Sequence, residues 1–163
     1  MKQLDKSQIR EAVNEAYNKF KDQKGGANAN YIPFLANVPS DLFGIAVCLP
    51  DGEVIETGDT NYVFGIESVS KVLTAVLVLK QAGAKELLEK IGADATGLPF
   101  NSIMAILLEK DHPSTPLVNA GAIAACSMVK PVGNSDAKWA AIEQNMADLC
   151  GSKLTLLEEL YKS

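Results

Sequence analysis

A serine that is followed three positions later by a lysine can act as a nucleophile with its own base. Residues three positions apart lie on the same side of a helix, so the lysine amine can reach the serine hydroxyl. The chemistry would be attack of the hydroxyl on a carbonyl carbon to give an acyl-serine. The pairing occurs three times in the 163-residue sequence, at Ser68/Lys71, Ser127/Lys130 and Ser135/Lys138. Spacing alone does not choose among them.

Two of the three pairs have simple structural explanations. Ser135 precedes a predicted helix with a polar face, where it is expected to be the N-cap, with Lys138 in solvent. Ser127 comes at the end of a helix of small residues just before Pro131, where the helix dipole gives a negative potential. Neither position favours a nucleophile.

Ser68 has a different context. It is predicted at the first turn of a helix that follows an extended segment, so backbone N–H groups would face a developing oxyanion. Apolar surroundings remove hydration from a lysine and make it a usable base near neutral pH. The alternative is that Ser68 or Ser70 only caps the helix while Lys71 extends into solvent. The apolar neighbours of Lys71 in sequence are Val69, Val72, Leu73, Val76 and Leu77.

The elements that must position these residues follow from hydrophobic periodicity. Three- and four-residue spacing predicts an amphipathic helix over 5–23, and a continuous apolar run over 43–49, followed by Pro50-Asp51-Gly52, predicts a buried strand with a hairpin partner over 53–57. A long apolar helix is predicted over 68–81 and is closed by Gly83. Shorter helices are predicted over 85–91, 101–108, 119–128, 135–149 and 154–161.

This order of elements predicts an α+β fold with segregated strands and helices, and excludes an alternating parallel βαβ arrangement. We expect one domain over 1–163, with a helix and sheet strands in 1–66 and a mainly helical region in 67–163. No glycine-rich nucleotide-binding motif follows a strand.

Charge and cysteine content restrict the function further. The net charge of -5 disfavours a nucleic-acid partner, which needs clustered basic residues. Three widely spaced cysteines in apolar contexts, Cys48, Cys126 and Cys150, indicate buried free thiols in a reducing compartment. No secretory signal is visible at the start, so a cytoplasmic location is expected. The longest apolar run, 69–79, is too short to span a membrane.

The sequence has one histidine, His112. It does not form part of any conventional sequence motif for a Ser-His-Asp triad. We expect it to be a solvent-exposed loop residue.

Seven sequence blocks in the same order resemble those of the bacterial serine-dependent glutaminases. The resemblance implies the fold of serine β-lactamases and penicillin-binding transpeptidases, with the sheet incomplete in this chain. It also implies hydrolysis of L-glutamine to L-glutamate and ammonia through an acyl-serine. The blocks are Gly25-Gly26-x-Asn28-Ala29-x-Tyr31-Ile32-Pro33, Leu42-Phe43-Gly44-Ile45-Ala46, Asp51-Gly52, Gly58-Asp59, Glu67-Ser68-x-Ser70-Lys71, Gly97-x-Pro99-Phe100-Asn101-Ser102 and Asn119-Ala120-Gly121-Ala122.

The resemblance also implies roles for individual residues. Ser68 matches the family's nucleophile, which engages the substrate, and Lys71 matches the lysine that activates it. Tyr31 matches a tyrosine that lines the catalytic pocket and contacts the substrate, and Asn119 matches the asparagine that holds the amino-acid end of glutamine. Packing and helix capping, respectively, are the alternatives for these two. Glu67, where many members have glutamine, is a candidate pocket residue or simply a carboxylate at a helix N-terminus.

The family resemblance implies no metal and no cofactor, L-glutamine as the small-molecule partner, no membrane partner and a homo-oligomer. Family chains continue beyond the point that matches Ser163, with a glutamate, a second asparagine, two tyrosines and a Lys-Ser-Gly strand that complete the pocket. We therefore expect this chain to correspond to the N-terminal part of the enzyme. Two alternatives remain: a penicillin-recognising acyl-serine enzyme, although Ser-Asp-Asn and Lys-Thr-Gly are absent, and a non-catalytic helical interaction fragment.

Overall fold

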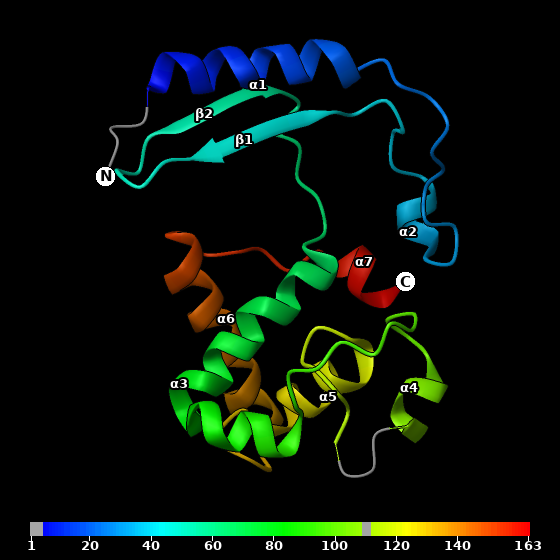
Figure 1. Ribbon diagram of the computed structural model, residues 1–163, viewed down its shortest axis with the longest axis vertical. Helices are drawn as coiled ribbons and strands as arrows, with labels where there is room; N and C mark the ends of the chain where they lie inside the picture. The colour runs from blue at the N-terminus through cyan, green and yellow to red at the C-terminus, as the bar shows by residue number, and fades with distance from the viewer. Residues whose placement is uncertain (1–4, 109–111) are drawn as a thin grey trace. The chain divides into compact units, whose positions relative to one another are not determined.

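The computed structural model describes residues 5–108 and 112–163 and combines helices with one two-stranded antiparallel sheet (Figure 1). This is the predicted α+β class with an incomplete sheet. The chain divides into two compact units, residues 1–65 with 157–163, and residues 66–156. In chain order the elements are α1 (Lys6–Phe20), α2 (Pro33–Ala36), β1 (Gly44–Cys48), β2 (Val54–Gly58), the 3-10 turn η1 (Glu67–Val69), α3 (Ser70–Lys90), α4 (Ile103–Leu108), α5 (Asn119–Met128), α6 (Ser135–Cys150) and α7 (Glu158–Lys162).

Helix α1 opens the first unit with a side-chain cap. The carboxylate of Asp5 accepts hydrogen bonds from the backbone N–H groups of Ser7 and Gln8 at 3.0 and 3.4 Å. These bonds satisfy N–H groups that have no partner within the helix. The predicted helix is confirmed, although it ends at Phe20 and not at residue 23.

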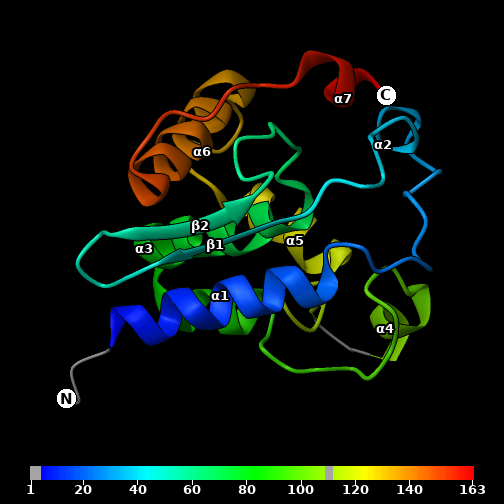
Figure 2. The ribbon, with the colours of Figure 1, turned by 90° about the horizontal axis from the view of Figure 1, so that it is seen from above.

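The hairpin packs against the apolar face of α1, and Figure 2 shows the helix running alongside both strands. The strands pair from Gly44 opposite Gly58 to Cys48 opposite Val54. The predicted hairpin is confirmed, although its second strand spans 54–58 and not 53–57. The prediction that the first strand is buried is wrong: alternate residues of β1 are exposed, because within the described residues the helix covers one face of the sheet. The small core consists of Val13, Leu49 and Ile55, with Ile9, Ile45 and Val47 packed on it.

Gly58 is required where α1 meets the end of β2. Its φ of +81° lies in the left-handed region, which glycine enters at little cost. A Cβ there would lie 2.3 Å from both the Tyr17 ring and the Phe43 carbonyl oxygen. The rings of Tyr17 and Phe43 stack with their centroids 5.6 Å apart. The absence of a side chain at Gly58 therefore lets this aromatic pair close over the strand.

Short helices α2 and α7 contact each other within the first unit, although they lie far apart in sequence. The backbone N–H of Phe34 donates to the Ser163 hydroxyl at 3.1 Å.

The second unit is built on α3, with α5 and α6 packed against it. The sequence predicted two helices separated at Gly83, and the structure has a kinked α3 in which Gly83 alone leaves helical geometry, at φ +85° and ψ 164°. The kink lets both halves of α3 contribute to one core. Its buried residues are Leu77, Val78, Leu87, Ile91, Ala125 and Val129.

The structure explains the two serine–lysine pairs that lie outside α3. Ser127 donates its hydroxyl hydrogen to the Ala124 carbonyl oxygen at 2.7 Å, as a helix residue with a structural role would. The expectation for Ser135 is wrong in detail, because Asn134 is the N-cap and accepts the Ala137 N–H at 3.0 Å. Lys138 is not free in solvent either, since its amine donates to the Ser127 carbonyl at 2.9 Å. A cation suits that carbonyl, because the C-terminal end of a helix carries negative potential.

Two further expectations about burial need correction. The three cysteines are free but exposed, because the apolar residues around them in sequence do not enclose them in the described chain. His112 is half-buried and packs against Gly92. A Cβ added to Gly92 would lie 2.7 Å from the Nδ1 atom of His112. That Nδ1 atom is buried without a hydrogen-bond partner among the described residues. No helix in residues 5–108 or 112–163 is long and apolar enough to cross a membrane.

Candidate functional site

Ser68 lies in η1, a 3-10 turn, and not in the first turn of an α-helix as the sequence suggested. The α-helix begins only at Ser70, and Glu67, directly before Ser68, adopts a φ of +44°. A non-glycine residue in this region is strained, and such strain concentrates at functional sites. The Ser70 hydroxyl donates to the Glu67 carbonyl at 2.6 Å and so holds the turn.

The side chain of Ser68 is exposed, and its hydroxyl makes no hydrogen bond within the described residues. The hydroxyl of Ser70 is bonded back into the turn, so Ser68 is the serine of this block with an available hydroxyl. Glu67 is also exposed. Ser70 therefore has a structural role in the turn, whereas a substrate could reach Ser68.

The amine of Lys71 is held by residues from two other parts of the second unit. Its Nζ atom donates to the side-chain oxygen Oδ1 of Asn119 at 2.6 Å, and it lies 5.5 Å from the centroid of the Phe100 ring. The predicted apolar enclosure of Lys71 is incomplete, because Val69 and Val72 are exposed and Lys71 itself is half-buried. A polar partner and an aromatic face, in place of apolar burial, fix the position of the amine.

Asn119 is the first residue of α5, but its side chain does not cap the helix. The N-cap residue is Val118, and no side-chain capping bond is made there. The Asn119 backbone N–H donates to the Phe100 carbonyl at 2.9 Å, which leaves its amide group directed to Lys71. The capping explanation is therefore wrong in this structure.

Gly121 explains why α5 can begin where it does. A Cβ on Gly121 would lie only 1.8 Å from the carbonyl oxygen of Thr115, so only glycine fits under the preceding loop. The glycine of the Asn-Ala-Gly-Ala block thus allows the loop to approach α5, and this packing sets the place of Asn119 two residues earlier.

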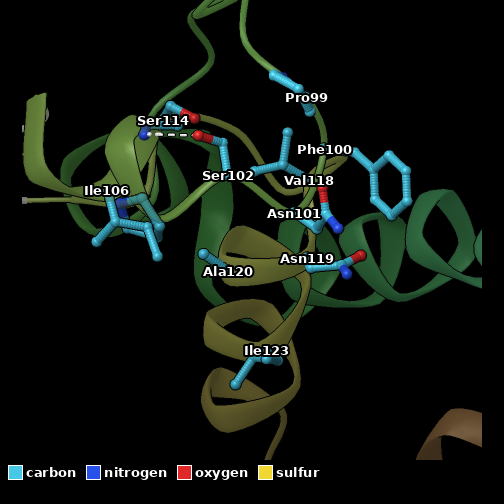
Figure 3. A pocket seen from close by; sticks show the side chains of 12 residues that line it. Pro99, Phe100, Asn101, Ser102, Ile106, Ser114, Val118, Asn119, Ala120 and Ile123 are labelled. Atoms are coloured by element: carbon cyan, nitrogen blue, oxygen red, sulfur yellow. Dashed lines mark hydrogen bonds between the residues drawn. The ribbon is translucent and has the colours of Figure 1, made fainter.

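Beside Asn119 the second unit has an open pocket of about 390 Å³. Figure 3 shows the side chains of Phe100 and Asn119 directed to the same side, away from Ile106. The Ser102 hydroxyl accepts the backbone N–H of Ala105 at 3.4 Å on the other side. The pocket is lined by Pro99, Phe100, Asn101, Ser102, Ala105, Ile106, Pro113, Ser114, Val118, Asn119, Ala120 and Ile123, and so touches Asn119 but not Ser68 or Lys71.

Of the predicted site residues, the structure brings Lys71 and Asn119 together, with Ser68 and Glu67 in the turn just before Lys71. Tyr31 belongs to the first unit, where it lies just before α2 with 77% of its surface exposed. Sequence reasoning gave no role to Phe100, although it stood in a recognised block. No group of three His, Cys, Asp or Glu side chains suited to a metal occurs among the described residues.

The comparisons with known proteins agree on one family. Residues 26–163 match the model of the glutaminase family. A glutaminase from Bacteroides thetaiotaomicron is 67% identical over 162 residues, which are 99% of this chain and 50% of that protein. A glutaminase from Escherichia coli O81 is 44% identical over 160 residues, or 98% of this chain and 51% of that protein. The chain thus spans about half the length of the relatives it matches.

Solved structures agree. A probable glutaminase, ybaS, superposes with a TM-score of 0.86 at 46% identity, over 90% of this chain and 47% of that one. The protein Mglu, in its L-glutamate binding form, superposes with a TM-score of 0.85 at 28% identity, over 96% of this chain and 36% of that one. These neighbours confirm the predicted β-lactamase-like α+β class. Sequence and structure together show that the chain belongs to the glutaminase family.

Proposed function

We propose that this chain supplies the nucleophile and base of an enzyme that hydrolyses L-glutamine to L-glutamate and ammonia. The observation that carries the proposal is the 2.6 Å hydrogen bond from the Lys71 amine to Asn119, with Ser68 three residues before Lys71 and its hydroxyl without a hydrogen bond in the described residues. It joins the residue that matches the family's base to the residue that matches its substrate-binding asparagine. The relatives' name and the L-glutamate binding form of the structural neighbour Mglu support the choice of substrate.

In the proposed reaction the Ser68 hydroxyl attacks the side-chain carbonyl carbon of glutamine while Lys71 accepts the hydroxyl proton. The C–N bond breaks, the proton passes to the leaving nitrogen, and ammonia departs from a glutamyl ester on Ser68. Water then attacks the ester carbonyl, releases glutamate and restores the serine hydroxyl. No redox step or additional reactant besides water is required.

Asn119 has two tasks in this scheme. Its Oδ1 atom holds the Lys71 amine, and the amide has capacity left to bind the amino-acid end of glutamine. Tyr31 is proposed to contact the substrate, and Glu67, next to Ser68 in sequence, to contribute a carboxylate. The role of Tyr31 is supported by the resemblance of its sequence block to that of the family and by the exposure of its side chain.

We further propose that the enzyme acts in the cytoplasm, without a nucleic-acid or membrane partner, as a homo-oligomer. The acidic net charge of -5 supports the lack of a nucleic-acid partner, and the three free cysteines support the cytoplasm. The homo-oligomer and the lack of a membrane partner rest on the family resemblance. Native mass measurement of the assembled enzyme checks the oligomer, and cell fractionation checks the compartment.

The test uses this chain assembled with the complementary half of the Bacteroides thetaiotaomicron glutaminase, because the chain matches half of that relative. Ser68→Ala should abolish glutamine hydrolysis. Ser127→Ala and Ser135→Ala are matched controls, since these serines belong to the other two serine–lysine pairs, and should keep activity within about twofold. Full activity of Ser68→Ala would overturn the assignment. A stable penicillin adduct on Ser68 would favour the penicillin-recognising class instead.

A further inference from the structure

Three contacts in the second unit form a closed triangle. The Lys71 amine donates to Asn119 Oδ1 at 2.6 Å, the Asn119 backbone N–H donates to the Phe100 carbonyl at 2.9 Å, and the Phe100 ring lies 5.5 Å from the Lys71 amine. One residue, Phe100, thereby contacts both members of the Lys71–Asn119 pair. It does so through two different groups, a ring and a backbone carbonyl.

The ring of Phe100 does not serve to fill a core. It is 55% exposed, and Phe100 belongs to neither cluster of buried apolar residues. The face of the ring lies within the distance, about 6 Å, at which a ring attracts an ammonium group, and Lys71 becomes an ammonium in the proposed reaction when it accepts the serine proton.

We propose that Phe100 is a positioning residue that holds the Lys71 amine through its ring and Asn119 through its carbonyl. The inference rests on the proposed function, in which Lys71 is the base and Asn119 binds substrate. Lys71 carries its amine on a flexible chain whose rotamers are costly to restrict. The ring and the Asn119 oxygen approach the amine from separate segments, so together they restrict it to one place.

The two groups of Phe100 give the proposal a distinctive signature. Phe100→Leu removes the ring but keeps the backbone carbonyl, so the position of Asn119 should be preserved while the Lys71 amine is released. We therefore expect kcat to fall by about three- to tenfold with KM within about twofold. Phe100→Tyr keeps an aromatic face and should retain both constants within about twofold. A second ring-free variant, Phe100→Met, repeats the test if Phe100→Leu fails to fold.

Labelling of lysine amines tests the positioning without any turnover. The full 163-residue chain is acetylated briefly, and the rate at Lys71 is measured by peptide mass spectrometry. Phe100→Leu should raise the Lys71 rate by about two- to fivefold, the size of a cation–π contact near the surface, and Phe100→Tyr should not.

Phe20 is the matched control. It is also an exposed phenylalanine, with the Lys19 amine 5.4 Å from its ring, and it has no part in the proposed site. Phe20→Leu should raise labelling of Lys19 and leave glutamine hydrolysis by the assembled enzyme unchanged.

The outcomes separate the two proposals. Unchanged Lys71 labelling in both ring-free variants would overturn the positioning role, and so would faster labelling with an unchanged kcat. If the assembled wild-type enzyme fails to hydrolyse glutamine while labelling responds as expected, the proposed function fails and the Phe100 contact to Lys71 stands.

Discussion

At the scale of single residues, the Lys71 amine is bonded to an amide oxygen and not to the serine three positions before it. The Ser68 hydroxyl is left without a hydrogen bond in the described chain. Catalytic hydrogen bonds are often long or unformed before substrate binds and tighten in the complex. The lack of a Ser68–Lys71 hydrogen bond in this structure is therefore compatible with the proposed roles of the two residues.

This arrangement makes a sharp prediction for Lys71→Arg. Arginine can still donate to Asn119 Oδ1, but it does not deprotonate at working pH and so cannot accept the serine proton. Turnover of the assembled enzyme should fall by at least about a hundredfold, the lower range for loss of a general base. Circular dichroism should show an unchanged fold. Retained turnover would mean that Lys71 only supports the structure.

At the scale of elements, the N-terminus of α1 depends on one carboxylate. The pKa of Asp5 lies below its ordinary value of 3.8, chiefly because the carboxylate accepts the Ser7 hydroxyl, with help from the backbone N–H groups of Gln8 and Ser7. A lowered pKa means that the capping contribution is fully present above pH 3.8 and is lost as pH falls through the folded-state pKa.

We therefore expect the first turn of α1 to loosen only below pH 3.8, which NMR titration of the Ser7 and Gln8 amides can follow. Asp5→Asn keeps an acceptor that does not titrate, so this pH dependence should disappear in that variant. A midpoint at or above 3.8 would contradict the cap.

Helix α5 depends on the glycine of its first turn. Gly121→Ala would place a methyl group 1.8 Å from the Thr115 carbonyl oxygen, and backbone cannot move aside as a flexible side chain would. We expect a loss of about 2–4 kcal/mol in the free energy of unfolding, measured with denaturant, and a displaced Asn119. Gly26→Ala is the control, since no atom lies within 4 Å of a Cβ there, and it should be close to neutral. Equal stability of both variants would show that the loop can shift freely.

At the scale of the whole molecule, the sheet of the described chain has two strands, so both strands leave an edge unpaired. Two-stranded sheets are marginal without further cover, and open edges favour pairing with another chain. The chain also matches only about half the length of its relatives. Groups that complete an oxyanion site and pocket are therefore expected from the complementary half.

We predict that the purified 163-residue chain hydrolyses glutamine near background, because loss of one oxyanion donor commonly costs on the order of a hundredfold. Adding the complementary half of the Bacteroides thetaiotaomicron glutaminase as a separate polypeptide should restore ammonia release. The same mixture with Ser68→Ala should stay at background. Robust hydrolysis by the chain alone that is lost on Ser68→Ala would show that the pocket closes in another way.

The sequence by itself determined the local elements and the candidate chemistry. Periodicity at three, four and two residues depends only on neighbours along the chain, so α1, the hairpin and the break at Gly83 could be predicted. The Ser68/Lys71 spacing and the ordered family blocks are likewise properties of the linear chain. The family blocks identified Asn119 as a candidate site residue, but they did not show which residues it contacts.

The tertiary structure decided what those residues touch. Lys71 and Asn119 are 48 positions apart, and only the packing of α5 on α3 makes their hydrogen bond possible. Phe100 joins them for the same reason, and apolar neighbours in sequence did not enclose Lys71 or the cysteines. Burial and long-range contacts depend on which faces pack together, whereas a periodic pattern specifies only which face each residue occupies.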